Sequence, residues 1–191
     1  NLDPELFIDK TLEGNVRDKV VVITGGGSGI GLGIAQRVAG AGAIVVICGR
    51  TLDKLEAAKQ SIVEAGGVCH TYAVDLTDLN DCDKFIDQVI ADHGRVDILV
   101  NNAGRSIRRA VEHSYDRFHD FERTMQLNYY SALRCTLRVL PGMSERKSGH
   151  IINISSMGVI GPPARFSAYV ASKSALEGFS RCAETEYADR N

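Results

Sequence analysis

A strand-like run that enters a helix through a glycine-rich turn constrains the fold of this chain more than any other feature. The run covers residues 20–24, and residues 24–31 read TGGGSGIG before a segment of helical period begins. Gly25 permits a tight turn, Gly29 lets the main chain approach a pyrophosphate, and Gly31 allows close packing of helix on strand. The free N–H groups of the helix would face the anion. The turn predicts a dinucleotide site; the alternative is an ordinary surface turn.

Short β-branched runs alternate with longer segments of helical period from Lys19 onward. Unbroken hydrophobicity, as at residues 20–23, implies strands that are buried on both faces. Repeated β-α units joined by right-handed crossovers favour an α/β fold with a doubly wound parallel sheet of the Rossmann type. The predicted strands are 20–24, 43–48, 68–74, 96–101 and 150–155, and the predicted helices are 31–41, 52–65, 79–93, 116–144 and 167–189.

The chain has the composition of one globular domain, with 191 residues of which 44% are hydrophobic. Residues 1–18 are polar and contain a proline, so we interpret them as a linker or an arm that precedes a nucleotide-binding domain at residues 19–191. A sheet that ended with strand 150–155 would expose an apolar edge. We therefore expect part of the fold to lie beyond Asn191.

Charge and cysteine content exclude several classes of function. A formal net charge of -2 argues against a general nucleic-acid binder. The five cysteines are scattered and include no C-x-x-C pair, which suggests neither a zinc site nor a disulfide framework and favours a cytoplasmic location. The histidines show no metal-ligand spacing, so we expect no metal. No apolar run approaches the roughly 20 residues of a transmembrane helix.

The end of the second predicted strand indicates which dinucleotide binds. An acidic residue there would bind the ribose 2′-hydroxyl of NAD, but this chain has Cys48-Gly49-Arg50. The planar guanidinium of Arg50 suits the 2′-phosphate of NADP(H), with Ser28 and Thr51 as further contacts. The alternative is that Arg50 is a solvated charge after a strand.

Two further strand ends carry candidate cofactor contacts. Asp75 follows the third predicted strand and could accept a hydrogen bond from the adenine amino group. The sequence Asn101-Asn102-Ala103-Gly104 ends the fourth and would bring small residues against a cofactor ribose. Both could instead be ordinary turn residues, because Asp, Asn and Gly favour turns.

Residues 128–173 contain a candidate catalytic set. Tyr169 and Lys173 are four residues apart and would share one face of a helix. A free phenol has a pKa of about 10, and a nearby ammonium lowers such a value toward neutrality. Ser156 could donate to a substrate oxygen as negative charge develops there. Asn128 is a poor helix former inside a predicted helix, which suggests a specific role. The alternatives are an exposed Tyr–Lys pair without chemistry and a buried, satisfied asparagine.

The order of these motifs resembles the classical short-chain dehydrogenase/reductase family: T-G-x-x-x-G-I-G, N-N-A-G, an Asn, a Ser and Y-x-x-x-K, over residues 19–191. The resemblance implies that Tyr169 is the general acid in carbonyl reduction and that Ser156 orients the carbonyl. It also implies that Lys173 holds the nicotinamide ribose and favours the phenolate, and that Asn128 supports a water leading to the lysine.

The same resemblance implies a set of cofactor contacts and an incomplete C-terminal part. The later strands and the substrate-covering loop of the family have no counterpart in residues 19–191, so we expect a fold that lacks them. The implied NADP(H) contacts are Gly25, Ser28, Gly29, Ile30, Gly31, Arg50, Asp75, Leu76, Asn102, Ala103, Gly104, Tyr169 and Lys173.

Three arginines beside the expected substrate mouth, Arg105, Arg108 and Arg109, could meet the phosphate of coenzyme A or of a carrier protein. A solvated loop or a subunit contact is the alternative. Together with residues 3–12, this stretch resembles the carboxy-terminal reductase domain of bacterial two-domain fatty acyl-CoA reductases. That resemblance implies a small carbonyl substrate such as an acyl-CoA or a fatty aldehyde.

Two other functions stay open: reduction of a 3-oxoacyl thioester, a steroid-like ketone or a sugar, and an idle nucleotide-sensing or assembly domain, because a fold can outlast its activity. The family commonly pairs its two long helices, here 116–144 and 167–189, across a two-fold axis. We therefore expect a homodimer or a homotetramer.

Overall fold

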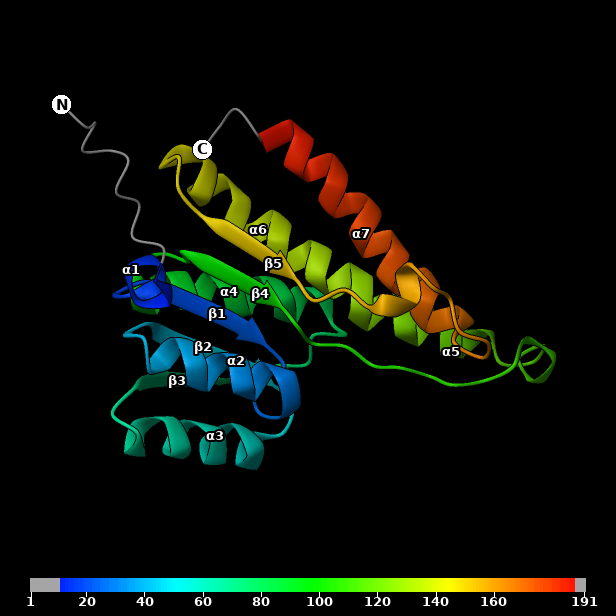
Figure 1. Cartoon of the computed structure of the whole chain (residues 1–191), viewed down its shortest axis with the longest axis horizontal. Helices are drawn as coiled ribbons and strands as arrows, with labels where there is room; N and C mark the ends of the chain where they lie inside the picture. The colour runs from blue at the N-terminus through cyan, green and yellow to red at the C-terminus, as the bar shows by residue number, and fades with distance from the viewer. Residues whose placement is uncertain (1–10, 188–191) are drawn as a thin grey trace.

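The structure is a computed structural model in which residues 11–187 are described. Its five strands form one sheet in the order β3-β2-β1-β4-β5, and every neighbouring pair is parallel (Figure 1). This confirms the predicted doubly wound α/β fold. The strands are β1 Val20–Thr24, β2 Ile44–Gly49, β3 Val68–Ala73, β4 Ile98–Asn101 and β5 His150–Asn153.

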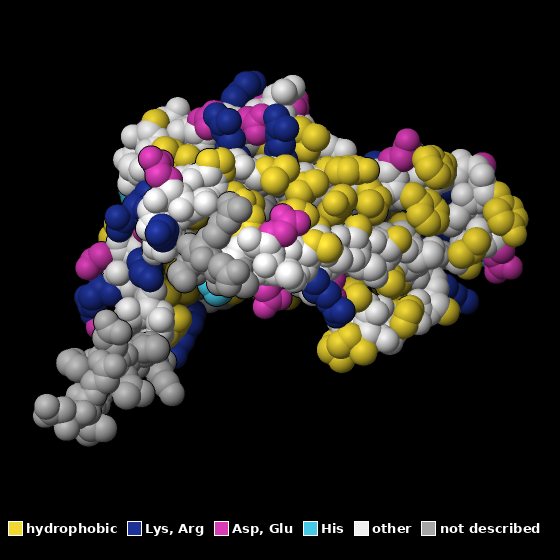
Figure 2. Space-filling view, turned by 90° about the horizontal axis from the view of Figure 1, so that it is seen from above, with side chains coloured by type: hydrophobic (Ala, Val, Ile, Leu, Met, Phe, Trp, Pro, Cys, Tyr) yellow, Lys and Arg dark blue, Asp and Glu magenta, His cyan; other side chains and the backbone are white. Residues whose placement is uncertain are grey.

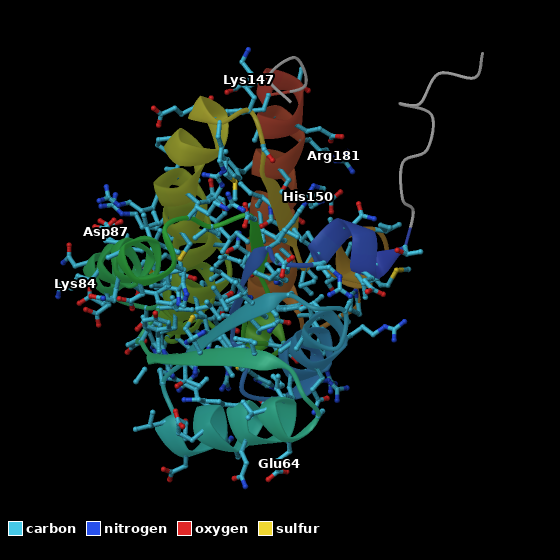
Figure 3. All side chains as sticks on the ribbon, turned by 90° about the vertical axis from the view of Figure 1, so that its left-hand side faces the viewer. Glu64, Lys84, Asp87, Lys147, His150 and Arg181 are labelled. Carbon is cyan, nitrogen blue, oxygen red and sulfur yellow. The ribbon has the colours of Figure 1, made fainter. Side chains whose placement is uncertain are left out.

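Helices cover both faces of the sheet. Alternate residues of β1 point to opposite faces, so Val20 and Val22 join one buried cluster while Val21 and Ile23 join the other. The first cluster is closed by α4 and α6, and the second by α2 and α3 (Figures 1 and 3). The helices are α1 Leu12–Val16, α2 Gly29–Ala39, α3 Leu52–Glu64, α4 Leu79–His93, α5 Phe118–Met125, α6 Ser131–Glu145 and α7 Ser167–Tyr187, with short 3-10 turns at Val111–His113 and Met157–Val159.

Ion pairs on the outer surface join two helices of the first layer. Arg138 of α6 donates two hydrogen bonds, both of 2.7 Å, to Asp87 of α4, which points away from the sheet (Figure 3). Arg134 makes the same kind of fork with Asp83 one turn earlier. These pairs join α6 to α4 on the outer surface.

Some predicted bounds differ from the observed ones. Helix α2 begins at Gly29 instead of residue 31, because the N–H of Leu32 already donates to the Ser28 carbonyl at 3.2 Å. The predicted helix 116–144 is divided by a π-helical turn at Gln126–Tyr130. The sequence did not predict α1, which is too short to show a period; its Val16 is buried in the second cluster.

Two predictions fall partly outside the described residues. Most of the segment 3–12 that carried the fatty acyl-CoA reductase resemblance lies there, as does the predicted end of the last helix at residue 189. Among residues 11–187, no helix is long and apolar enough to cross a membrane. The same residues contain no group of three or more His, Cys, Asp or Glu side chains arranged to hold a metal ion.

The strand order determines where a ligand can bind. From β1, the chain builds β2 and β3 on one side and later β4 and β5 on the other. The connecting helices therefore pack on opposite faces, and a crevice is left at the carboxyl ends of β1 and β4. The residues that follow Thr24 and Asn101 lie at this crevice.

Candidate active site

The glycine-rich turn leaves β1 in a conformation that glycine alone adopts readily. Gly25 and Gly29 both have positive φ, at 67° and 55°. A Cβ on Gly31 would lie 2.4 Å from the Gly25 carbonyl oxygen and 2.5 Å from Asn102 Nδ2, which leaves no room for a side chain. A Cβ on Gly29, in contrast, would meet no atom within 4 Å. The turn is therefore tightly packed at Gly31 and open at Gly29, where a pyrophosphate could approach the main chain.

Thr24 joins this turn to the end of β4. Its hydroxyl donates to the Val100 carbonyl at 3.3 Å and accepts from the main-chain N–H groups of Asn102 and Ala103, both at 3.0 Å. The side-chain Nδ2 of Asn102 donates a hydrogen bond to the Thr24 carbonyl at 2.9 Å. These contacts hold the two turns side by side.

A cavity of about 400 Å³ opens along these turns and the end of β2. Most of the predicted cofactor contacts line it, whereas Gly29, Gly31, Tyr169 and Lys173 do not. The predicted contacts in its lining are Gly25, Ser28, Ile30, Arg50, Asp75, Leu76, Asn102, Ala103 and Gly104.

The cavity also contains a cation that sequence reasoning missed. Lys54 follows Arg50 by four residues, and both line the cavity together with Thr51. That spacing after a strand was the signal that could have revealed it. Two cations at the end of β2 suit an anionic group such as a ribose phosphate.

Asp75 is held as a carboxylate at the edge of the same cavity. Its Oδ1 accepts from the N–H of Thr77 at 3.0 Å and from the Thr77 hydroxyl at 2.8 Å, and these bonds lower the pKa of Asp75. Because a carboxylate has further acceptor positions, Asp75 could accept from an amino group of a ligand. The lining thus fits a dinucleotide: glycine turns near its middle, two cations and an acceptor toward one end.

Lys173 lies buried on α7 beyond the Gly104 end of the cavity. It is 4% exposed, and its Nζ donates to the Ile154 carbonyl at 2.6 Å. Burial lowers the pKa of Lys173. Tyr169 lies one turn earlier on α7, is half-buried, and meets the Phe166 ring edge-on with 6.5 Å between centroids.

Asn128 lies at the centre of the π-helical turn and is 1% exposed. Its Oδ1 accepts from the Arg105 N–H at 2.8 Å, and its Nδ2 donates to the Arg105 carbonyl and to the Ser172 hydroxyl, both at 2.9 Å. Ser172 in turn donates to the Tyr169 carbonyl at 2.7 Å. The side chain is therefore a satisfied amide that joins three segments, and both its N–H groups are used within the protein.

Gly104 connects the cavity with the catalytic candidates. A Cβ built on Gly104 would lie 3.3 Å from Asn128 Oδ1 and 3.7 Å from Lys173 Nζ. Gly104 also lines the cavity. The end of β4, the π-helical turn and α7 therefore converge at one place.

Ser156 follows β5 and begins the 3-10 turn Met157–Val159. Its hydroxyl oxygen accepts from the Gly158 N–H at 3.1 Å, which leaves the hydroxyl proton free to donate. A Cβ on Gly158 would be 3.3 Å from both Ser156 Oγ and Val170 Cγ2. The serine loop thus packs against the residue next to Tyr169.

Comparison with known proteins identifies the family that has this arrangement. The profile of the family described as short chain dehydrogenase matches residues 19–191. The chain belongs to the short chain dehydrogenase family. A fatty acyl-CoA reductase from Acinetobacter baylyi is 57% identical over 172 residues, which cover 90% of this chain and 58% of that protein. The chain thus spans little more than half the length of this curated relative.

Solved structures of short chain dehydrogenases share the fold. A metagenomic short-chain oxidoreductase in complex with NADP matches with a TM-score of 0.87 and 35% identity, covering 92% of this chain and 79% of that one. An NAD⁺-bound xylitol dehydrogenase matches with a TM-score of 0.86 and 31% identity, covering 92% and 67%. These neighbours establish a fold that holds nicotinamide cofactors, and they include both NADP and NAD⁺.

The three arginines predicted at the substrate mouth have different surroundings in this short chain dehydrogenase. Arg105 lines a small cavity with Arg50, and its main chain binds Asn128. Arg109 donates to the buried Asp120 at 3.1 Å. Arg108 lies over the Phe166 ring, 6.0 Å from its centroid. Arg108 and Arg109 thus line one cavity, and Arg105 lines another.

Proposed function

We propose that this chain binds NADP(H) and transfers a hydride between the nicotinamide and a carbonyl/alcohol pair, with Tyr169 as the general acid in reduction. The observation that carries the proposal is the convergence of Gly104, Asn128 and Lys173 at the end of the dinucleotide cavity. The membership of the chain in a dehydrogenase family supports the same reaction class.

The proposal assigns a role to each catalytic candidate. Tyr169 gives its proton to the carbonyl oxygen as that oxygen becomes an alkoxide, and Ser156 donates to the same oxygen. Lys173 favours the phenolate that remains and contacts the cofactor ribose. Asn128 is a positioning residue, because its bonds to Ser172 and Arg105 fix α7 against the end of β4. Bound NADPH would supply the hydride.

Preference for NADP(H) over NAD(H) is supported by Arg50 and Lys54 in the cavity lining. Cys48-Gly49-Arg50 at the end of β2 also lacks the acidic residue that would bind a ribose 2′-hydroxyl and repel a phosphate. The NADP-bound neighbour is consistent with this preference.

The substrate that we propose is a fatty acyl-CoA or a fatty aldehyde. The 57% identical relative, named a fatty acyl-CoA reductase, supports it. Reduction of an acyl thioester by NADPH and one proton would give an aldehyde, a thiol and NADP⁺; reduction of an aldehyde would give an alcohol and NADP⁺. A panel containing 3-oxoacyl thioesters, steroid ketones and sugars separates this substrate class from others.

We further propose a homodimer or homotetramer in the cytoplasm. Apolar side chains gather on part of the face seen in Figure 2, and Leu137 of α6 is 50% exposed. Burial of such a surface stabilises association. All five cysteines are free, which supports a reducing compartment. Light scattering tests the assembly, and a clean monomer would contradict it.

The Tyr169→Phe variant tests the proposed reaction. We expect kcat with NADPH to fall by roughly 100-fold to 10,000-fold, because a positioned proton donor is lost, while the Kd for NADPH stays the same. Tyr130→Phe removes a hydroxyl from an exposed tyrosine and serves as the matched control. Equal activity of the wild type and Tyr169→Phe would contradict the proposal.

A further inference from the structure

A second cavity, of about 320 Å³, lies between the loop that follows β4 and the loop that precedes α7. Figure 1 shows both loops at the end of the molecule that carries α5. The cavity is lined by Arg108, Arg109, Ala110, His113 and Arg165. Every lining residue except the alanine carries a cation or a ring nitrogen, so the cavity is equipped to meet an anion.

Carboxylates of residues 11–187 compensate the positive charge of this cavity only in part. Arg108 and Arg165 form no ion pair with any carboxylate of residues 11–187. Arg109 does pair with Asp120 at 3.1 Å, but Arg117 contacts the same carboxylate oxygen at 3.0 Å. Both arginines therefore share one negative charge.

The neighbouring side chains do not change this balance. The Arg117 guanidinium beside Asp120 lowers the pKa of that carboxyl, so its single charge is already engaged. Glu112 faces His113 at 3.8 Å, and both side chains are exposed. On α6, in contrast, Arg134 and Arg138 each have a carboxylate of their own. At this cavity, two of the three arginines, Arg108 and Arg165, have no such partner among residues 11–187.

The cavity is joined to the catalytic segment. The Arg109 N–H donates to the Arg165 carbonyl at 2.7 Å, and Arg165 holds the left-handed conformation, with φ of 72°. Arg108 lies over Phe166, whose ring meets Tyr169. The cavity is therefore linked to Tyr169 through the Phe166 ring.

Apolar side chains on the same loops indicate what else a ligand held here would contain. Met157 and Ile160 lie one and four residues after Ser156 and are 79% and 80% exposed, and Val111, next to Ala110, is 60% exposed. A substrate with an apolar chain and an anionic group would contact both kinds of surface. A neutral sugar has neither an apolar chain nor an anionic group, so it would match neither surface.

We propose that Arg108, Arg109, His113 and Arg165 bind a phosphate group of an acyl thioester substrate, the phosphate that coenzyme A and carrier-bound phosphopantetheine share. This rests on the proposed function for the thioester itself. Guanidinium forks donate two parallel bonds to phosphate oxygens, and the two unpaired arginines, Arg108 and Arg165, can both do so. The cavity then selects thioesters that carry a phosphate over uncharged carbonyl compounds.

The test uses a double variant, Arg108→Gln with Arg165→Asn; asparagine tolerates the left-handed conformation that Arg165 adopts. We compare kcat/KM for dodecanoyl-CoA, dodecanoyl-pantetheine, which lacks phosphate, and dodecanal. For dodecanoyl-CoA the loss should be about tenfold or more, mainly in KM, and should exceed the loss for the two uncharged substrates. Arg37→Gln removes an exposed arginine on α2 and is the control.

Calorimetry with free coenzyme A and saturating NADP⁺ gives a readout that does not depend on turnover. The wild type should bind coenzyme A, and the double variant should bind it about tenfold more weakly. Equal binding by both, or equal losses for all three substrates, would overturn this inference. A wild type that binds coenzyme A but reduces no thioester or aldehyde would instead refute the proposed function. Comparing dodecanoyl-CoA with dodecanoyl carrier protein identifies the source of the phosphate.

Discussion

The cofactor cavity and the catalytic side of the crevice differ in how the fold holds their residues in place. The cavity opens along the glycine turns that follow β1, whose five residues are all buried. The catalytic side is made of side chains on loops and on α7, next to β5, whose residues are half-buried or exposed. Lys173 and Asn128 are held there by hydrogen bonds instead of by a sheet.

This difference predicts how the two regions respond to substitution. A side chain added at Gly31 collides with the main chain of Gly25, the residue that directly follows β1. A side chain removed from the catalytic side leaves the sheet intact. Substitution of a packed glycine in the first region should therefore change folding and binding together, whereas loss of the partly exposed Ser156 in the second should change mainly the chemistry.

Ser156→Ala should have the largest effect and the least structural cost. We expect kcat/KM for the carbonyl substrate to fall by about 100-fold to 1000-fold, because a donor to the developing alkoxide is lost. The melting temperature should change little, since Ser156 is partly exposed and makes one internal bond, to the Gly158 N–H. A drop in stability as large as that of a core variant would break the comparison.

Gly31→Ala should reduce stability and cofactor affinity together. Its Cβ would lie 2.4 Å from the Gly25 carbonyl oxygen, and such overpacking costs about 1–3 kcal/mol in the free energy of unfolding. Gly33→Ala, on the same helix but with no atom within 4 Å of the added carbon, is the control and should stabilise by up to about 1 kcal/mol. Urea unfolding measures the stability and NADPH titration measures the affinity. Equal stability and equal affinity of Gly31→Ala and Gly33→Ala would contradict this account.

Arg50→Gln should weaken NADPH binding by about tenfold and leave NADH binding nearly unchanged, because one charge-assisted contact to the 2′-phosphate is lost. Fluorescence titration with both cofactors gives the two dissociation constants. Lys54→Gln should act in the same direction. If Arg50→Gln weakened NADH equally, the arginine would support the turn and not the phosphate.

Lys173→Met should reveal the smallest effect, a change in how stability depends on pH. Burial lowers the pKa of Lys173 below the ordinary lysine value of about 10.4. Between its lowered pKa and that value, the unfolded chain binds a proton that the folded chain does not, so this group makes the free energy of unfolding rise with pH. The difference between wild type and Lys173→Met should increase with pH in urea titrations; a constant difference would contradict the burial effect.

The sequence predicted the cofactor region better than the catalytic region. All five strands and the glycine turn followed from local patterns, because apolar runs and glycines affect the conformation of the residues next to them in the sequence. The missed Lys54 was also a local signal, four residues after Arg50. Helix α1 was missed because five residues cannot show a period.

The contacts of the catalytic region join residues that are far apart in the chain. Asn128 binds groups 23 and 44 residues away, and nothing near it in the sequence indicates which ones. Its π-helical turn was likewise predicted as ordinary helix. Arg109 was predicted to meet a substrate phosphate or to lie on a solvated loop or at a subunit contact, and its partner Asp120 could be assigned only from coordinates. The roles of Ser156, Tyr169 and Lys173 stay predictions.

The hydroxyl of Thr24 has a consequence for the order in which the molecule folds. Its bonds reach residues 76 to 79 positions later, so they form only after β4 has docked beside β1. Closing so long a loop has an entropic cost that local helices avoid. Nucleotide affinity should therefore appear late during refolding, and a nascent chain that has not yet emerged through β4 should be unable to retain the dinucleotide.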